Sequence, residues 1–261
     1  MENFIMKHIL SPVWARVFLF SLIGLLSLQA QPGGPLGGGT PGMNMGGVDA
    51  FLTKFFGEVQ AFSATAEMTI KGKGENMTMP SEFAMLDGKM RMDMDLGKVK
   101  GDGMAAAMGP QLKQMGMDKM GTITDPKKKE ILLIYPGLKS YAAMAIPKAQ
   151  AEMMDKEPKV EKQEVGKETV DGHPCKKIKY TITDDKGKKQ EALVWTATDL
   201  KEFPVKIESG AEGMQVTILY KDIKLEKPAA KLFEPPAEFT KYDNVQALMQ
   251  GAMMKMMEGL K

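Results

Sequence analysis

The stretch "LDGKMRMDMDL", from Leu86 to Leu96, decides the fold. Its Asp87-Gly88 pair is a strong short-range signal for a tight hairpin turn. After the turn, methionines alternate with charged residues at every second position, which is the period of a strand with one buried face and one wet face. The stretch therefore predicts an antiparallel sheet.

The same two-residue period runs through much of the chain on both sides of this hairpin. In "ATAEMTIK" (residues 64–71), Ala, Met and Ile alternate with Thr, Glu and Lys. Comparable segments, separated by turn residues, predict about ten short strands in two runs. They include "TITD", "EILLIYP", "KSYAAMAI", "KKIKYTIT", "QEALVWTA", "FPVKIES" and "MQVTILYKDI". Because one face of each strand stays wet, we expect these strands to pair antiparallel in one curved sheet.

Other segments carry the spacing of an amphipathic helix. Residues 48–62, "VDAFLTKFFGEVQAF", repeat apolar side chains at steps of three and four. A short helix is expected from Pro147, and a final helix is expected after its cap, Asn244. Residues 100–120 form a Gly- and Met-rich insertion, in which Gly109-Pro110 interrupts a helical pattern, so we expect a mobile or broken helix suited to act as a lid. This order of elements predicts helices on the concave side of the sheet.

The first thirty residues indicate where the protein works. Lys7 and Arg16 precede the apolar run "VFLFSLIGLLSL", and the small residue Ala30 follows that run. This pattern is typical of a secretory signal peptide cleaved near Ala30, and an uncleaved membrane anchor is the alternative. No cysteine lies near the cut, so a lipid-modified anchor is not expected. We therefore expect an exported protein, periplasmic or secreted, with a flexible Gly/Pro-rich leader at residues 31–47 and a single domain at residues 48–261.

The composition argues against several classes of protein. The formal net charge of the chain is +2, and Arg91 is the only arginine beyond the signal. A nucleic-acid-binding protein would show a basic excess and arginines for bidentate contacts, so nucleic acid is not an expected partner. The single cysteine excludes an internal disulfide. We identify no motif for a cofactor or a phosphate.

His173 and Cys175, in "DGHPCKKIKYTI", are the one pair that invites a catalytic or metal-binding interpretation. A catalytic pair needs an orienting partner and an oxyanion site, and the chain has no further His or Cys beyond the signal to supply them. Zinc would need three or four nitrogen or sulfur ligands. Residues two apart on a strand also stand about 7 Å apart, too far for a hydrogen bond between their side chains. We therefore expect a turn at Asp171-Gly172 followed by a buried thiol, and no enzymatic activity.

The segment around this turn resembles a bacterial family of exported proteins catalogued as domain of unknown function 4412. The resemblance spans roughly residues 160–242 and rests on four short patterns: G-x-x-C, W-x-A-x-D-L, P-V-K and L-F-x-x-P. In this sequence they are Gly172 and Cys175, then Trp195, Ala197, Asp199 and Leu200, then Pro204, Val205 and Lys206, and finally Leu232, Phe233 and Pro235.

The wider layout resembles the LolA/LolB-like lipoprotein carriers. In "EVQAFSATAEMTI" and "GKMRMDMD", a helix ending in F-x-A leads into a long sheet, as those proteins begin. The resemblance implies a mainly β (α+β) fold: a curved antiparallel half-barrel of about ten strands with helices covering its concave face. It also implies that an acyl chain or another apolar ligand binds on that face.

The 25 methionines supply the candidate site. Thioethers make an adaptable apolar wall, which suits a lipid acyl chain or an apolar partner segment. They are also soft ligands that select Cu(I), which makes Met90, Met92 and Met94 an alternative copper site, and a purely structural role is the third alternative. Peripheral contact with the cell envelope is expected in the first case. The candidate ligand-binding residues are Met68, Met90, Met92, Met94, Tyr180, Trp195, Met253 and Met256.

Overall fold

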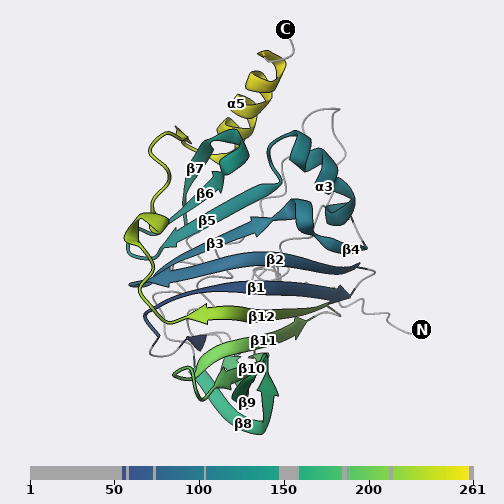
Figure 1. Cartoon of the computed structure of the whole chain (residues 1–261), viewed down its shortest axis with the longest axis vertical. Coiled ribbons are helices and arrows are strands. Elements are labelled where there is room, and N and C mark those ends of the chain that lie inside the picture. Colours follow the sequence, from purple (N-terminus) through teal and green to yellow (C-terminus); the bar gives the residue numbers. More distant parts are fainter. Residues whose placement is uncertain are drawn as a thin grey trace, which may run out of the picture.

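The computed structural model describes residues 55–56, 59–72, 75–102, 104–146, 159–183, 187, 189–211 and 214–258. The predicted signal peptide, the leader, most of the helix at residues 48–62 and the short helix from Pro147 lie outside these ranges. Within them, one strongly curved sheet runs through the molecule, with the β8–β9 hairpin near one end and helix α5 at the other (Figure 1). No helix in these ranges is long and apolar enough to cross a membrane.

The sheet has 13 strands in the order β13-β7-β6-β5-β3-β2-β1-β12-β11-β10-β9-β8, and β4 pairs with β2 beside this path. Every neighbouring pair is antiparallel except β13 and β7. The strands are β1 (Ala61–Gly72), β2 (Glu75–Leu86), β3 (Lys89–Asp95), β4 (Lys100–Asp102), β5 (Lys119–Asp125), β6 (Glu130–Tyr135), β7 (Ser140–Ala145), β8 (Lys159–Val170), β9 (His173–Thr183), β10 (Lys189–Ala197), β11 (Phe203–Ala211), β12 (Met214–Lys224) and β13 (Thr240–Tyr242).

Two α-helices and three short 3₁₀ helices complete the described elements. They are α3 (Met104–Gln114), α5 (Val245–Glu258), η2 (Leu96–Lys98), η3 (Pro136–Leu138) and η4 (Ala230–Phe233). Asn244 caps α5 as predicted, because its Oδ1 accepts a hydrogen bond from the backbone N–H of Ala247 at 2.8 Å. Leu248 of α5 is fully buried and Leu112 of α3 packs against the same core, so both helices contribute apolar side chains to the sheet's inner face.

The predicted fold class is confirmed: the chain is mainly β, and a curved antiparallel sheet organises it. The sheet has more strands than the ten expected. The segment that forms β8 was not predicted as a strand, because almost all of its residues are exposed and no buried face imposes a two-residue period. The short strands β4 and β13 have only three residues each, too few for any period to appear.

Two hairpin turns follow directly from the sequence. Asp87 and Gly88 both have positive φ, 52° and 85°, as a type I′ turn requires. Asp171 and Gly172 repeat this geometry with φ of 50° and 84° and join β8 to β9. The predicted turn ahead of Cys175 is therefore confirmed.

The inner face of the sheet carries the main core. Along β3, Met90, Met92 and Met94 are 1–3% exposed and alternate with partly exposed neighbours, as predicted. We use the name inner cluster for the residues that share this face across the sheet. They are Met68, Ile70, Met77, Met79, Ser81, Phe83, Met85, Met90, Met92, Met94, Met120, Thr122, Leu133, Tyr180, Val194, Ile207, Val216, Ile218 and Tyr220.

The outer face carries a second, smaller apolar cluster beneath a strap, residues 225–239, that follows β12. Phe233 in η4 packs against Ala84 and Ile123 there. Arg91 donates a 2.7 Å hydrogen bond to the backbone oxygen of Leu232 and also pairs with Asp93. Arg91 and Asp93 retain only 19% and 33% side-chain exposure. Together, Arg91 and Asp93 fasten the strap to β3.

Two helix predictions also need correction. The helix predicted for residues 48–62 does not include its last two residues, because Ala61 and Phe62 pair with β2 as the start of β1. Helix α3 is not broken at Gly109-Pro110 but continues through Pro110. Buried Gly109 lies against the backbone of η2, and this tertiary packing offsets the hydrogen bond that proline cannot donate.

Candidate functional site

The pair His173 and Cys175 has the geometry of a structural turn rather than a catalytic dyad. The imidazole Nδ1 of His173 pairs with Oδ2 of Asp199 at 2.8 Å. The thiol of Cys175 instead points to the backbone oxygen of His173 at 3.4 Å, and the residue is 4% exposed. Burial raises the pKa of this thiol, so it stays protonated and is a poor nucleophile.

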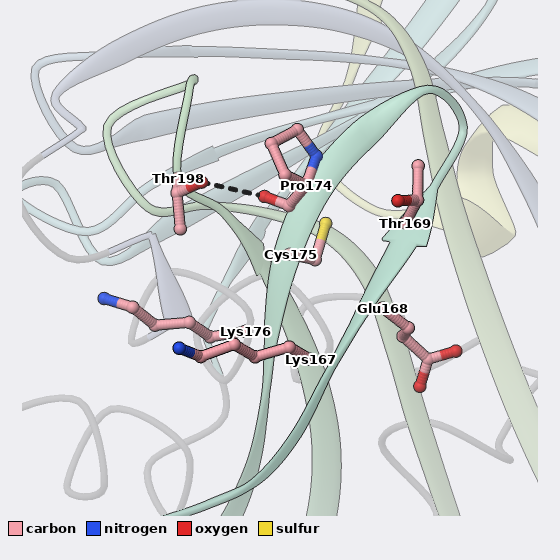
Figure 2. A pocket seen from close by; sticks show the side chains of 7 residues that line it. All are labelled: Lys167, Glu168, Thr169, Pro174, Cys175, Lys176 and Thr198. Atoms are coloured by element: carbon pink, nitrogen blue, oxygen red, sulfur yellow. Dashed lines mark hydrogen bonds between the residues drawn. The ribbon is translucent and has the colours of Figure 1, made fainter.

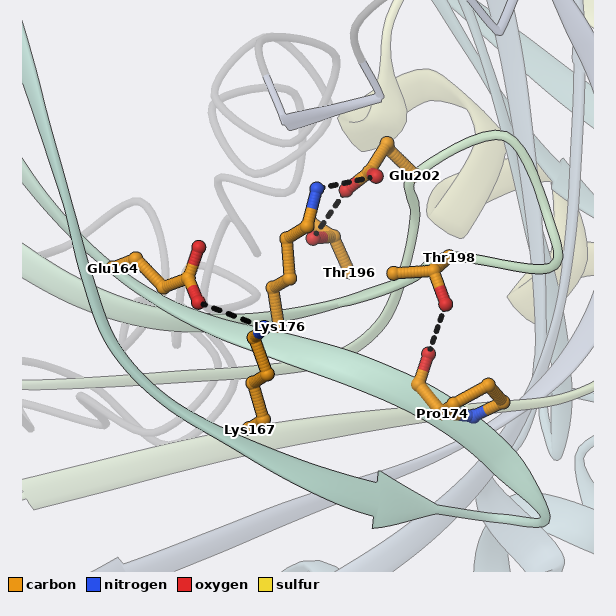
Figure 3. Close-up of polar contacts among 7 residues, drawn as sticks. All are labelled: Glu164, Lys167, Pro174, Lys176, Thr196, Thr198 and Glu202. Atoms are coloured by element: carbon orange, nitrogen blue, oxygen red, sulfur yellow. Dashed lines mark hydrogen bonds and ion pairs between the residues drawn. The ribbon is translucent and has the colours of Figure 1, made fainter.

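A cavity of about 390 Å³ opens beside Cys175, between β8 and the start of β9 (Figure 2). Its charged side chains already have partners: Lys176 lies 2.9 Å from Glu202, and Lys167 lies 4.0 Å from Glu164 (Figure 3). Its lining residues are Lys167, Glu168, Thr169, Pro174, Cys175, Lys176 and Thr198. In the described part of the chain, no three His, Cys, Asp or Glu side chains come together as metal ligands would.

The same corner joins two of the motifs that carry the family resemblance. The backbone N–H and the hydroxyl of Thr198 both donate to the oxygen of Pro174, at 2.9 and 3.0 Å. Cys175 stands directly opposite Ala197 in the β9–β10 ladder. The G-x-x-C and W-x-A-x-D-L segments therefore hold each other in place. This contact gives the two motifs a structural role that requires no catalytic chemistry.

The methionines, in contrast, form a continuous surface on the inner face. Met68 stands directly opposite Met79, Met85 opposite Met90, and Met94 opposite Met120. Directly opposed side chains in an antiparallel pair have Cβ atoms about 5 Å apart, so their thioethers lie in contact range. The result is an apolar wall across β1, β2, β3 and β5 in which each of these methionines is at most 4% exposed.

Aromatic rings continue this wall on the β11–β12 side. Phe62 packs edge-on against Phe203 at 5.0 Å between centroids, and Phe203 packs against Tyr220 at 5.6 Å. Phe56 stacks on Phe62 at 4.6 Å, and Phe55 meets the Tyr180 ring at 4.9 Å. The sequence patterns did not assign these phenylalanines to the site. Their dense spacing at residues 51–62 was the available signal, and it indicated only the apolar face of a helix.

The inner cluster contains no charged side chain, whereas the outer side is covered by ion pairs within and between strands. Lys179–Glu191 at 2.7 Å, Lys206–Glu208 at 2.6 Å and Lys221–Glu67 at 2.8 Å are examples. Burial raises the pKa of Tyr180, so its phenol also stays neutral. A ligand against the methionine wall would therefore meet no charge, whereas Lys162 of β8 stands opposite Tyr180, with its ammonium group 5.2 Å from the ring centroid.

The predicted site residues do not all reach this wall. Met68, Met90, Met92, Met94 and Tyr180 lie in the inner cluster. On α5, Met253 is 53% exposed, and the side chain of Met256 lies outside the described residues.

Trp195 was predicted on the apolar face, and the structure places it on the other side of the sheet. It stands opposite Lys177 and Lys206 in the two adjoining ladders. Their ammonium groups lie 4.7 and 4.2 Å from the indole centroid. The indole N–H of Trp195 and the ammonium group of Lys177 lie near the Glu168 carboxylate, and both lower the pKa of Glu168. The indole contact is looser than a well-formed hydrogen bond. The aliphatic parts of these two lysine side chains cover the indole, so Trp195 is buried although it lies on the outer face of the sheet.

Comparison with known proteins yields a family and a set of distant structural likenesses. A family model described as a domain of unknown function (DUF4412) matches residues 64–203, more than half of the chain. No curated protein sequence matches.

Among solved structures, the lipoprotein LppX of Mycobacterium tuberculosis aligns with a TM-score of 0.39 and 14% identity, over 70% of this chain and 93% of that one. A LolA superfamily protein from Nitrosomonas europaea aligns with a TM-score of 0.29 and 10% identity, over 69% and 92%. The MucA/MucB complex of Pseudomonas aeruginosa aligns with a TM-score of 0.38 and 15% identity, over 74% and 62%. Scores this low leave the function to be inferred from the chain's own residues.

Proposed function

The chain belongs to the family described as domain of unknown function 4412, and we propose that it is an exported, non-enzymatic protein that binds an apolar ligand against the inner cluster. The resemblance predicted from the sequence is thereby confirmed. The match begins further toward the N-terminus than expected and stops at Phe203, so the P-V-K and L-F-x-x-P patterns lie beyond it.

The observation that carries the proposal is the methionine wall. A core that serves only stability is usually built from Leu, Ile, Val and Phe, because their rotamers are well defined and specify one packing. Methionine has three rotatable bonds and a polarisable sulfur, so it fits surfaces of varied shape. Eight methionines lie together on the inner faces of β1, β2, β3 and β5, where the sheet is continuous: Met68, Met77, Met79, Met85, Met90, Met92, Met94 and Met120.

The same residues argue for a flexible hydrocarbon ligand rather than a polar one. The inner cluster carries no charge, so a charged ligand group placed there would lack a counter-ion. An acyl chain needs only apolar contact, which contributes about 0.8 kcal/mol for each buried CH₂ group. The expected partner is therefore a lipid or an apolar segment of a protein in the cell envelope.

Entry of a ligand requires the covering elements to move, because the methionines are buried. Helix α3 is the suitable element in the described chain: it packs mainly on η2 and β4 at one end of the sheet, and Met108 remains 37% exposed. Leu112 of α3 packs against the core. We assign α3 the role of the lid, so a bound ligand should protect it from proteolysis.

Met92 provides the test, with pyrene-labelled dodecane and Cu(I) as separate probes. Met92→Leu should keep the alkane affinity within about twofold, because volume and polarity are conserved. Met92→Asp should abolish alkane binding and the protection of α3, because it places an unpaired charge on an apolar wall. Met254→Asp is the matched control, since Met254 is 59% exposed, and should bind the alkane like the wild type.

The alternative Cu(I) site predicts the opposite pattern. Loss of a thioether in Met92→Leu would weaken Cu(I) binding by removing a soft ligand. Wild-type protein that ignores the alkane but binds Cu(I), with the metal lost in Met92→Leu, would contradict the proposal and favour the copper site.

A further inference from the structure

Ser81 and Thr122 are the two small hydroxyl side chains within the inner cluster. Ser81 is 4% exposed and Thr122 is 2% exposed, and neither Ser81 Oγ nor Thr122 Oγ1 has a hydrogen-bond partner. A buried hydroxyl without a partner costs about 1–3 kcal/mol, whereas alanine or valine in the same place would cost nothing of this kind. Unpartnered groups of this kind in native folds need an explanation.

Three other buried polar side chains do have hydrogen-bond or ion-pair partners. Ser140 Oγ donates to the oxygen of Leu138 at 2.9 Å, and Thr196 Oγ1 donates to Glu202 at 3.0 Å. Asp125 accepts backbone N–H groups and pairs with Lys89. The fold therefore satisfies these three polar side chains, whereas Ser81 and Thr122 lie together on the face proposed to receive a ligand.

The strand register fixes where the two hydroxyls stand. Ser81 on β2 is opposite Met94, and Thr122 on β5 is opposite Met92, so they flank β3 from either side. Strands lie about 4.8 Å apart and alternate residues about 7 Å apart, which separates the two positions diagonally by about 12 Å. A single small group cannot reach both hydroxyls, but two acceptors on one ligand can.

The surroundings restrict the chemistry of those acceptors. Each hydroxyl can donate one hydrogen bond, and the residues paired with Ser81 and Thr122 on the adjoining strands are all uncharged, so no counter-ion for an ionised group stands beside either hydroxyl. A carboxylate or a phosphate would be left buried without a counter-ion. Neutral carbonyl oxygens meet both conditions.

We propose that Ser81 and Thr122 donate hydrogen bonds to two ester carbonyls of the bound ligand, which is therefore a neutral lipid diester of the diacylglycerol class. This inference rests on the proposed apolar-ligand function and specifies the ligand of the same site. The acyl chains lie along the methionines, and the two hydroxyls set how deep the ester groups sit.

The test compares diacylglycerol carrying pyrene on one acyl chain with pyrene-labelled dodecane. The double variant Ser81→Ala with Thr122→Val should lose about tenfold in affinity for the diester, because two hydrogen bonds are removed. Its affinity for the alkane should not fall. Its melting temperature should equal or exceed that of the wild type, so misfolding would not explain a loss.

Thr78→Val is the matched control, because Thr78 lies on the same strand as Ser81 but on the outer face, where its hydroxyl bonds to Thr69 at 3.2 Å. It should bind both probes like the wild type. If the wild type binds both probes and the double variant binds the diester as tightly as the wild type does, the diester inference is wrong while the proposed function stands. If the wild type binds neither probe, the proposed function fails and this inference fails with it.

Discussion

At the turn between β8 and β9, neighbouring side chains bond to different partners. The imidazole of His173 bonds to Asp199 of the turn after β10, and the thiol of Cys175 bonds to the backbone. The hydrogen bond from His173 lowers the pKa of Asp199. This contact ties two turns together across the sheet, so its contribution should appear as stability that depends on pH.

The direction of that dependence follows from the sign of the shift. A carboxyl group with a lowered pKa in the folded state contributes stability above its unfolded pKa of about 3.9, and this is lost as pH falls through the folded value. Asp199→Asn should therefore lose less stability than the wild type when pH falls from about 5 to about 2.5. Urea midpoints at the two pH values check this. Equal losses in both proteins would show that the His173–Asp199 pair contributes nothing.

Residue chemistry was partly predictable from the sequence. The lack of a further His or Cys to join His173 and Cys175 favoured a turn and a buried thiol, and both are confirmed, although the carboxylate that orients His173, Asp199, was not predicted. The outer position of Trp195 was not predictable, because its lysine neighbours come from β9 and β11 and a bulge in the β10–β11 ladder intervenes. Ser81 and Thr122 carried no signal either, since a hydroxyl on a strand is ordinary until its lack of partners is known.

At the scale of elements, glycines fix how the segment after α3 meets the sheet. Gly116 has φ of 68°, and its backbone lies so close to Gly137 in η3 that a Cβ on Gly137 would overlap it. The glycines of the insertion were interpreted as a sign of mobility. At this position the contact instead requires glycine, which anchors the C-terminal end of the insertion beside η3.

Gly137→Ala should therefore destabilise the fold by about 1–3 kcal/mol, because backbone must move to admit the methyl group. Gly166→Ala on β8 is the matched control, since no atom lies within 4 Å of the place that its Cβ would take, and it should change stability by less than about 0.5 kcal/mol. Denaturation with urea at constant m-value measures both. A Gly137 variant as stable as the wild type would contradict the close contact.

Elements with one buried face were predictable, and the others were not. β3 and β9 showed their alternation because the inner cluster selects apolar residues at every second position. β8 lacks that selection, being exposed along nearly its whole length. Helix α3 was expected to break because proline removes a donor, but packing of Gly109 on η2 could not be inferred from local sequence.

At the scale of the whole molecule, the sheet separates two environments. Its inner face carries a wall of methionine and aromatic side chains, and its outer face carries ion pairs and the strap fastened by Arg91. The sequence predicted this division from the two-residue period alone. It could not predict the order of strands, because pairing of β1 with β12 joins residues 142 to 161 positions apart.

Native mass spectrometry of the protein purified from its own host tests the central claim, binding of an apolar ligand, most directly. We expect the chain to retain an added mass, which organic solvent releases and which fragments as a lipid. Met92→Asp should lose that mass while Met254→Asp keeps it. A wild-type chain that carries no added mass, or one that carries only copper, would contradict the binding of an apolar ligand.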